Sequence, residues 1–250
     1  MLIIVEQSAR PIASMKPYLV AFFLASVFFA PSPVSGQTYR DLYPRKVDVA
    51  LAHALENETA YQTIFDEYNC SSSFLISLVL PEVSNYNEYK DLVELKALEV
   101  FYTELGAEYS DFSVGLFQMK PSFIESLEKS VRENEFLEDF HRITQYSTNN
   151  PIEIRAERID RIRQLEWRTR YLCCFYCLVN EKFRHIAFES EEEKLAFFAM
   201  VYNRGIEASE EEIRRWMQIP YFPNRGTQGD FSYSSVALEF YKILSTYDRI

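Results

Sequence analysis

The chain has 250 residues, its aromatic fraction is 16%, and its formal net charge is −11 at pH 7. This length is enough for one medium-sized domain with a substantial core. The negative charge disfavours nucleic-acid binding, which depends on Lys and Arg side chains that neutralise phosphates. It also gives no electrostatic attraction toward an anionic polymer, and neither of the phosphate-binding patterns GxxxxGK(S/T) and GxGxxG occurs in the sequence.

Residues 1–36 have the features of a signal peptide. Lys16 precedes an apolar stretch, residues 19–30, and small residues follow near Gly36. A membrane span needs about 20 apolar residues, so the short stretch favours cleavage near Gly36 over retention as a membrane anchor. We therefore expect an exported protein of a bacterial periplasm or cell envelope. Translation could start at Met15 as well as at the first residue.

Beyond residue 36, apolar residues recur at the spacing of helices. Helices are predicted over residues 47–68, 74–80, 90–105, 121–131, 136–146, 152–184, 189–202 and 232–245, with a short one that opens at Ser209. No series of strands is evident, so the sequence predicts an all-α protein. Residues 37–69 are expected to form an N-terminal helical extension, and residues 70–250 the main domain.

Two of these helices carry specific expectations. Residues 74–80 are apolar on nearly all sides, so we expect a buried helix, with a β-strand as the alternative for so short an apolar run. Pro81 follows, and it should kink or end the helix. Residues 152–184 are predicted to form one long helix. Its first half mixes six arginines with acidic residues, which is typical of a solvated face with weak i, i+4 ion pairs.

The four cysteines are Cys70, Cys173, Cys174 and Cys177. Their spacing is a poor zinc pattern, and the three histidines are scattered along the chain, so we expect neither a metal site nor a cofactor. The cysteines could be small apolar residues of the core. Alternatively, Cys70 could form a disulfide with one of the other three after export.

The most informative residue for function is Glu82, which follows the apolar run. Cleavage of a glycosidic bond needs an acid that protonates the leaving oxygen. A glutamate can do this at neutral pH only where its surroundings penalise the charged form. Leu80 and Pro81 before it indicate such apolar surroundings. The alternative is a glutamate that faces water at the end of a helix.

Two later segments add polar groups that suit sugars. Gly115 opens the stretch Gly-Leu-Phe-Gln-Met-Lys-Pro-Ser, in which Gln118 can both donate and accept hydrogen bonds. Glycine allows a close approach of the backbone or an unusual φ angle. A third segment contains Tyr202 and Asn203, followed by Gly205. Each of these patterns is weak when it is taken alone.

In this order the three segments resemble the lytic transglycosylase and goose-type lysozyme family. Residues 115–122 look like the GLMQ-x-x-PST signature of that family, and residues 199–205 look like its AYNAG segment. Glu82 lies where the family places its catalytic glutamate. The sequence departs from the pattern where Val83 stands in place of a serine, with Ser84 one position later.

The resemblance implies a lysozyme-like fold and cleavage of the bond between N-acetylmuramic acid and N-acetylglucosamine in peptidoglycan. Glu82 would act first as an acid and then as a base. The C6 hydroxyl of the muramic acid would attack C1 and give a 1,6-anhydro sugar. The residues implied to bind the glycan or to orient the acid are Gln118, Tyr202, Asn203, Gly115, Ser84 and Tyr233.

Two alternatives remain open at this stage. A hydrolase of the goose-type lysozyme kind needs a base that activates water, and Asp111 is the candidate, although an aspartate there could instead cap a turn. A non-catalytic protein that binds or assembles the cell wall is the other alternative. The sequence does not decide between cleavage within chains and from chain ends, nor does it give the oligomeric state, the cellular role or a partner in the cell envelope.

Overall fold

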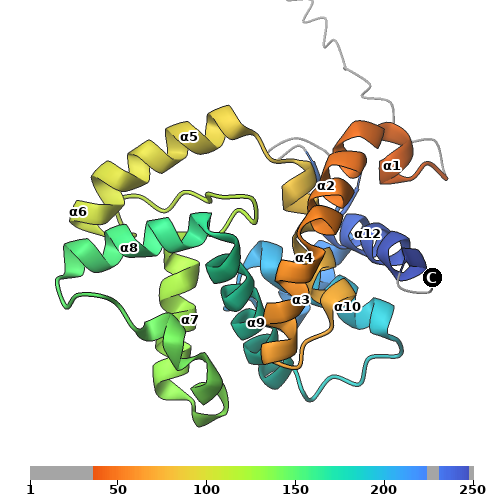
Figure 1. Cartoon of the computed structure of the whole chain (residues 1–250). Helices are drawn as coiled ribbons and strands as arrows, with labels where there is room; N and C mark the ends of the chain where they lie inside the picture. The colour runs from red at the N-terminus through yellow and green to blue at the C-terminus, as the bar shows by residue number, and fades with distance from the viewer. Residues whose placement is uncertain (1–35, 224–230, 248–250) are drawn as a thin grey trace, which may run out of the picture. The chain divides into compact units, whose positions relative to one another are not determined.

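The computed structural model describes residues 36–223 and 231–247, and these residues are helical apart from turns, loops and two isolated β-bridges (Figure 1). The all-α expectation is therefore confirmed. The predicted signal peptide lies outside the described residues, apart from Gly36. None of the helices in the described ranges combines the length and the apolar character that a membrane span requires.

The first half of the fold contains short helices and one helix with a π-helical turn. Its elements are α1 (Tyr39–Leu42), α2 (Pro44–Glu56), α3 (Glu58–Glu67), α4 (Ser72–Ser84), α5 (Glu88–Ala97), the π-helix η1 (Leu98–Tyr102) and α6 (Thr103–Leu105). The second half contains α7 (Pro121–Glu133), the 3-10 helix η2 (Glu135–Thr144), α8 (Pro151–Arg163), α9 (Leu165–Lys182), α10 (Glu191–Arg204), α11 (Glu210–Met217) and α12 (Tyr233–Tyr247).

Helix α4 is the centre of the packing. All residues from 74 to 84 are buried, and helices α2, α10 and α12 pack against this one. The helical prediction for this segment is confirmed over its strand alternative. Pro81 does not end the helix, which continues to Ser84. The proline removes one N–H from the helical hydrogen bonds, but the three residues after it remain helical. The hydroxyl of Tyr233 on α12 donates to the carbonyl of Leu78, at 2.9 Å, and joins the two helices one turn before Glu82.

The predicted helix over residues 47–68 is two helices, α2 and α3, which meet at Asn57. The amide of Asn57 donates to the carbonyl of His53, at 2.8 Å, and so competes with the helical ladder at this point. Val47 on α2 and Phe65 on α3 are buried in the same hydrophobic core as α4. The segment expected to be an N-terminal extension therefore shares its core with the main domain.

The prediction of one long helix over residues 152–184 is wrong. Gln164 has extended backbone angles, with φ −87° and ψ 135°, and separates α8 from α9. The prediction of a solvated arginine face is also wrong, because four of the arginines are buried, namely Arg158, Arg161, Arg168 and Arg170. An ion pair at i, i+4 occurs both on surfaces and in buried networks, so the charge pattern alone could not separate the two.

A buried ion pair between Arg158 and Glu128 joins α8 to α7. The guanidinium Nε and Nη2 atoms each lie 2.9 Å from a different carboxylate oxygen, which makes the pair bidentate. Tyr146 also donates its hydroxyl to Glu128. Only 1% of the Glu128 side chain is exposed. Each charge is therefore stabilised by its partner in place of water.

The remaining helix predictions are confirmed, although two of the segments contain a helix that is not an α-helix. Residues 90–105 contain α5, η1 and α6, and the helical run ends at Gly106, whose φ of 95° suits glycine. The segment predicted over residues 136–146 is a 3-10 helix rather than an α-helix. Ser209 caps α11 by accepting a hydrogen bond from the backbone N–H of Glu212, at 3.2 Å.

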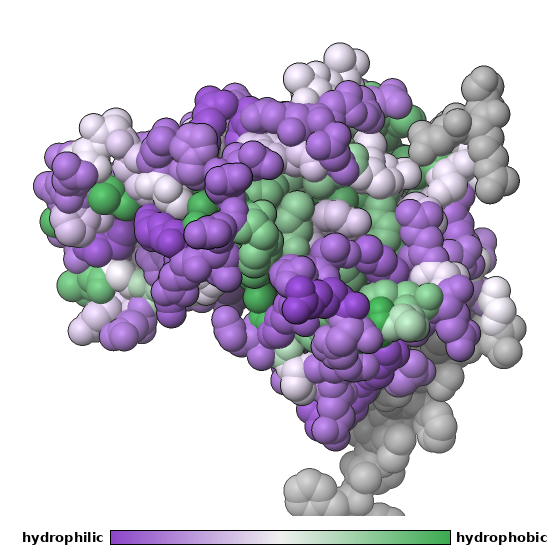
Figure 2. All heavy atoms as spheres, turned by 90° about the horizontal axis from the view of Figure 1, so that it is seen from below, coloured by the Kyte–Doolittle hydropathy of each residue, from purple (hydrophilic) through white to green (hydrophobic). Residues whose placement is uncertain are grey.

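The surface seen in Figure 2 is largely hydrophilic, with hydrophobic side chains gathered in a recess across its middle. Many of the exposed large hydrophobic side chains belong to α5, η1, α6 and the loop that follows, namely Tyr89, Leu92, Val93, Val100, Phe101, Leu105, Tyr109 and Phe112.

Arg155 of α8 donates to the carbonyls of Thr103 and Glu104, at 2.7 and 3.0 Å. These bonds satisfy helix-end carbonyls and attach α6 to α8.

All four cysteines are free thiols, and Cys70 contacts both Cys173 and Cys177. The hydrogen bond with Cys173, together with burial, raises the pKa of Cys70 to about 12. A hydrogen bond with Cys70 and burial likewise raise the pKa of Cys177. The cysteines are thus packed as small residues of the core. Cys70 also lies next to Cys173 and Cys177, two of its three possible disulfide partners.

We expect the substitution Glu128→Gln to lower the free energy of unfolding by about 3–5 kcal/mol, because it leaves Arg158 buried without an opposite charge. Urea unfolding followed by circular dichroism measures this change. Glu133→Gln on the same helix is the matched control, since Glu133 is 59% exposed. The control should shift stability by less than about 0.5 kcal/mol. Equal stability of the two variants would contradict the role given to the buried pair.

Candidate functional site

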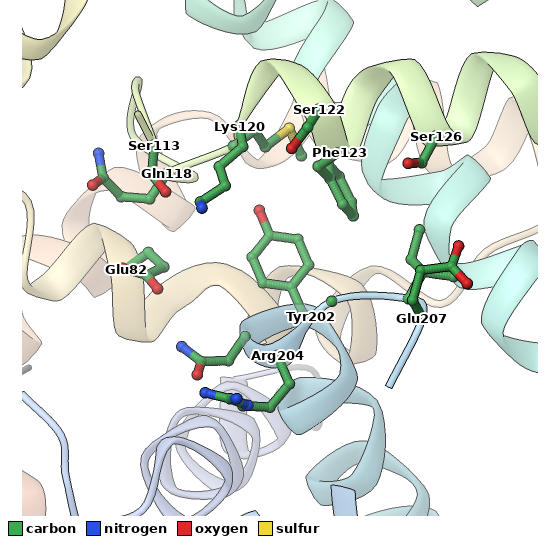
Figure 3. A pocket seen from close by; sticks show the side chains of 14 residues that line it. Glu82, Ser113, Gln118, Lys120, Ser122, Phe123, Ser126, Tyr202, Arg204 and Glu207 are labelled. Atoms are coloured by element: carbon green, nitrogen blue, oxygen red, sulfur yellow. The ribbon is translucent and has the colours of Figure 1, made fainter. Parts of the chain in front are cut away.

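A pocket of about 350 Å³ lies where the end of α4, the turn at residues 115–118, the start of α7 and the end of α10 meet. Its volume is within the range of small-ligand sites. The residues that line it are Glu82, Ser113, Gln118, Met119, Lys120, Ser122, Phe123, Ser126, Tyr202, Asn203, Arg204, Gly205, Ile206 and Glu207. Figure 3 shows Tyr202 in the middle, with Glu82 and Gln118 on one side and Glu207 on the other.

Glu82 lines this pocket from the end of a buried helix, and only 5% of it is exposed. The alternative that it faces bulk water is therefore excluded. Val83 and Ser84, the two residues after it, are buried as well. The protein thus holds a carboxyl group at the boundary between its core and a small opening, which is the setting that general acid catalysis by a glutamate requires.

The turn at residues 115–118 is built by its own backbone. Val114 and Met119 form a β-bridge with N–O distances of 3.0 and 3.1 Å, and the N–H of Gln118 donates to the carbonyl of Gly115, at 2.9 Å. Gly115 has a φ of 74°, and a Cβ atom there would lie 3.1 Å from the carbonyl oxygen of Ile162. Both the backbone angle and the close approach therefore require glycine at this position.

Gln118 itself has a φ of 50°, which is uncommon for a residue with a side chain. Its amide nitrogen donates to the carbonyl of Gly115, at 2.9 Å, and lies 3.3 Å from a carboxylate oxygen of Asp91. These bonds fix the side chain at the pocket wall. The amide oxygen is the group that Gln118 can still offer to a ligand.

Tyr202 connects α10 to the turn, because its hydroxyl donates to the carbonyl of Phe117 at 2.7 Å. Burial, and then the carboxylate of Glu82, raise the pKa of Tyr202 well above its ordinary value. The hydroxyl therefore stays a hydrogen-bond donor. Asn203 accepts a hydrogen bond from the hydroxyl of Tyr221, which orients its amide at the other wall.

Asp91 is a positioning residue that the sequence analysis missed. It is buried on α5, and one of its oxygens accepts from the N–H of Gly115, at 2.7 Å, and from Gln118. The other oxygen accepts from the hydroxyl of Tyr86, at 3.1 Å. Asp91 thus attaches the turn to α5. Its position in a pattern of alternating charges and apolar residues gave no signal of this role.

Four of the predicted site residues are not among those that line the pocket, namely Gly115, Ser84, Tyr233 and Asp111. The hydroxyl of Ser84 donates to the carbonyl of Pro81, at 2.7 Å, and lies 3.0 Å from the hydroxyl of Tyr39. Ser84 therefore closes the end of α4. Tyr233 is fully buried and bonded to Leu78, so its contribution to the site is the position of α4.

Asp111, the candidate second carboxylate, is not among the residues that line the pocket. Its two oxygens accept from the N–H and the hydroxyl of Ser122, at 2.9 and 2.7 Å. The ammonium of Lys120 lies 3.6 Å from the same carboxylate. Asp111 thus supplies the cap of α7 from a distant part of the chain, as a side-chain oxygen does for the unpaired N–H groups of a helix start.

Several lining residues were not anticipated. Lys120 and Glu207 bring a cation and a second carboxyl group to the pocket, and Arg204 lies below Tyr202 in Figure 3. Lys120 belongs to the segment that begins at Gly115, so its neighbourhood was indicated by the sequence. Glu207 follows Gly205 in a short loop, where nothing in the residue pattern distinguishes it.

Comparison of the chain with models of protein families, with characterised proteins and with solved structures found no match. No group of three or more His, Cys, Asp or Glu side chains suited to a metal ion occurs in the described ranges. A functional assignment therefore depends on the pocket and its chemistry.

Asp91→Ala should loosen the turn, because the N–H of Gly115 and the amide of Gln118 lose their shared acceptor. We expect the free energy of unfolding to fall by about 1–3 kcal/mol. Amide hydrogen exchange at residues 115–118 should become faster than in the wild type. Glu99→Ala is the control, since Glu99 is exposed on the neighbouring π-helix. Unchanged exchange at the turn in the Asp91 variant would show that this carboxylate does not hold it.

Asp111→Ala removes the cap of α7 and should lower stability by about 0.5–2 kcal/mol. Thermal unfolding measures this loss. Asp111→Asn retains one acceptor oxygen, so it should recover part of the stability. If both variants were as stable as the wild type, the carboxylate of Asp111 would be free for another role.

Proposed function

We propose that the protein is a peptidoglycan lytic transglycosylase with a lysozyme-like fold, and that Glu82 is its catalytic acid and base. The observation that carries this proposal is a buried glutamate that lines a pocket together with Gln118, Tyr202 and Asn203. The sequence placed these four residues in three separate segments, and the fold brings them to one opening.

In the first step Glu82 gives its proton to the glycosidic oxygen, and the bond between that oxygen and C1 of the muramic acid breaks. Positive charge develops at C1 and the ring oxygen. The N-acetyl group of the same sugar can stabilise this charge, so a second carboxylate of the protein is not required. An acid that is only 5% exposed is suited to this step, because its neutral form needs less solvation than its charged form.

In the second step the carboxylate of Glu82 takes the proton of the C6 hydroxyl, and the C6 oxygen bonds to C1. The product is a 1,6-anhydro sugar, no water is consumed, and Glu82 regains its proton. The geometry requires the sugar to be held still in the pocket. The free amide oxygen of Gln118 and the amide of Asn203 are the groups best placed to bind its hydroxyl and acetamido groups.

A hydrolytic reaction is the competing possibility, and it needs a base that activates water. Both oxygens of Asp111 are used by Ser122. Glu207 is the other carboxyl group that lines the pocket. The mass of the products distinguishes the two reactions, since hydrolysis adds one water.

We expect the purified protein to release products that end in 1,6-anhydro-muramic acid from peptidoglycan sacculi. Glu82→Gln should lower this rate by at least about a thousandfold, because an amide cannot transfer the proton. Mass spectrometry of the soluble products measures both the rate and the end group. Glu207→Gln is the matched control within the pocket, and it should keep anhydro products.

Three results would contradict the proposal. Reducing-end products that vanish with Glu207→Gln would indicate a hydrolase. Equal digestion by the Glu82 variant and the wild type would remove Glu82 from the chemistry. No digestion by protein whose circular dichroism shows a folded state would favour a wall-binding or assembly role.

A further inference from the structure

A second cavity, which we call the basic hollow, lies next to the proposed active site. It has a volume of about 490 Å³ and lies between α2 and the end of α4. Arg45, Lys46 and His53 of α2 line it opposite Ser84, Asn85 and Asn87. No aspartate or glutamate is among the residues that line the hollow, although the chain as a whole has 37 acidic residues against 26 basic ones.

The hollow and the pocket share structural elements. Glu82 lines the pocket, whereas Asn85, three residues later, lines the hollow. Residues at i and i+3 are neighbours on a helix surface, so the two openings are adjacent at the end of α4. The turn is shared as well, since Leu116 lines the hollow and Gln118 lines the pocket.

The two cations of the hollow differ in their contacts within the protein, since Lys46 also lies over the ring of Tyr43, 5.3 Å from its centroid. Arg45 is exposed, and no hydrogen bond or ion pair joins it to another described residue. Lys46 donates to the side-chain oxygen of Asn85, at 2.7 Å, which holds the ammonium at the hollow and leaves it further protons to donate. Both residues lie in the first turn of α2, which contains no acidic residue. Cations there oppose the helix dipole, so they are not placed for the stability of the helix.

His53 does not share this role. Its Nε2 atom lies 2.8 Å from the hydroxyl of Tyr61, and its Nδ1 atom lies 3.3 Å from the amide of Asn57. Burial, and then the charge of Arg168, lower its pKa, so the ring is neutral near pH 7. The positive charge of the hollow therefore comes from Arg45 and Lys46.

We propose that the basic hollow binds the carboxylates of the peptide that is attached to the muramic acid of the substrate. This inference rests on the proposed function. A peptide of three to five residues reaches at most about 10–18 Å, and Asn85 is about 4.5 Å along the helix axis from Glu82. A sugar in the pocket would thus have its peptide within reach of the hollow. Asn85 is already bonded to Lys46 and to the carbonyl of Pro223, and the side-chain oxygen of Asn87 accepts from the N–H of Lys90. The side-chain NH2 group of Asn87 is the asparagine group that the hollow offers to a peptide carbonyl.

Such a site would locally offset the repulsion between the acidic protein and an anionic substrate. A chain with a charge of −11 repels an anionic polymer. Two cations without a neighbouring carboxylate in the hollow make a local exception to that repulsion. They would favour glycan that still carries its peptides over glycan from which the peptides have been removed.

The test uses the full chain with Glu82→Gln, which binds without turnover, and two tetrasaccharide probes. One probe carries muramic acids with tripeptides whose carboxylates are free, and in the other these carboxylates are amidated. We expect calorimetry to show about tenfold tighter binding of the free-acid probe, a difference that shrinks as salt is added. The added double substitution R45Q/K46Q should make the two affinities equal. K129Q/R184Q removes the same charge at two exposed positions and should leave the difference intact.

Arg45→Gln alone serves as a second variant, because its exposed side chain has no role in folding that the contacts reveal. It should remove part of the difference between the probes. The inference would be overturned if the parent protein bound the two probes with equal affinity, or if R45Q/K46Q kept the difference between their affinities. Cleavage of sacculi by the wild type would in that case still support the proposed function. Failure of both probes to bind, with no cleavage of sacculi, would overturn the two together.

Discussion

The burial of α4 is the constraint on which the rest of the structure depends. A helix that is buried along its last eleven residues has no freedom to rotate or slide without opening the core. Glu82 is therefore held by packing rather than by a loop. Tyr233 adds a hydrogen bond one turn before it, and Tyr39 contacts the hydroxyl of Ser84 just beyond it. Burial, with help from the nearby carboxylates of Glu239 and Glu82, raises the pKa of Tyr39 to about 12, so this hydroxyl also stays protonated.

The second wall of the pocket is fixed by contacts from two helices and from the loop between α6 and α7. Asp91 on α5 holds the backbone of the turn, Tyr202 on α10 donates to Phe117, and Asp111 caps the helix that follows. The ring of Phe117 packs against Tyr61 of α3, with ring centres 6.2 Å apart, so the N-terminal helices support the turn as well. The pocket is thus an outcome of the whole helical assembly, and no single segment would form it alone.

The sequence predicted those features that depend on neighbours in the chain. The helical spacing of apolar residues located most helices, and the apolar run indicated the burial of Glu82. The breaks at Asn57 and Gln164 escaped prediction, because a side-chain hydrogen bond or a single extended residue can interrupt a periodic pattern without changing it. Asp91 escaped for another reason. Its partner Gly115 is 24 residues away in the chain. The residues around Asp91 in the sequence therefore do not show that its carboxylate accepts this hydrogen bond.

The buried arginines show why charge patterns are a weak guide to location. Arg161 pairs with Glu157 at i, i+4, as a surface residue would, yet it also donates to the carbonyls of Ile143 and Gln145 and is only 4% exposed. Those carbonyls belong to the end of η2 and the residue after it, where backbone acceptors are left unpaired. Arg161 is thus stabilised in a buried position by hydrogen bonds to backbone carbonyls that would otherwise be unpaired. At Arg45, on α2, the described residues offer no such acceptor, and its charge remains available to a ligand.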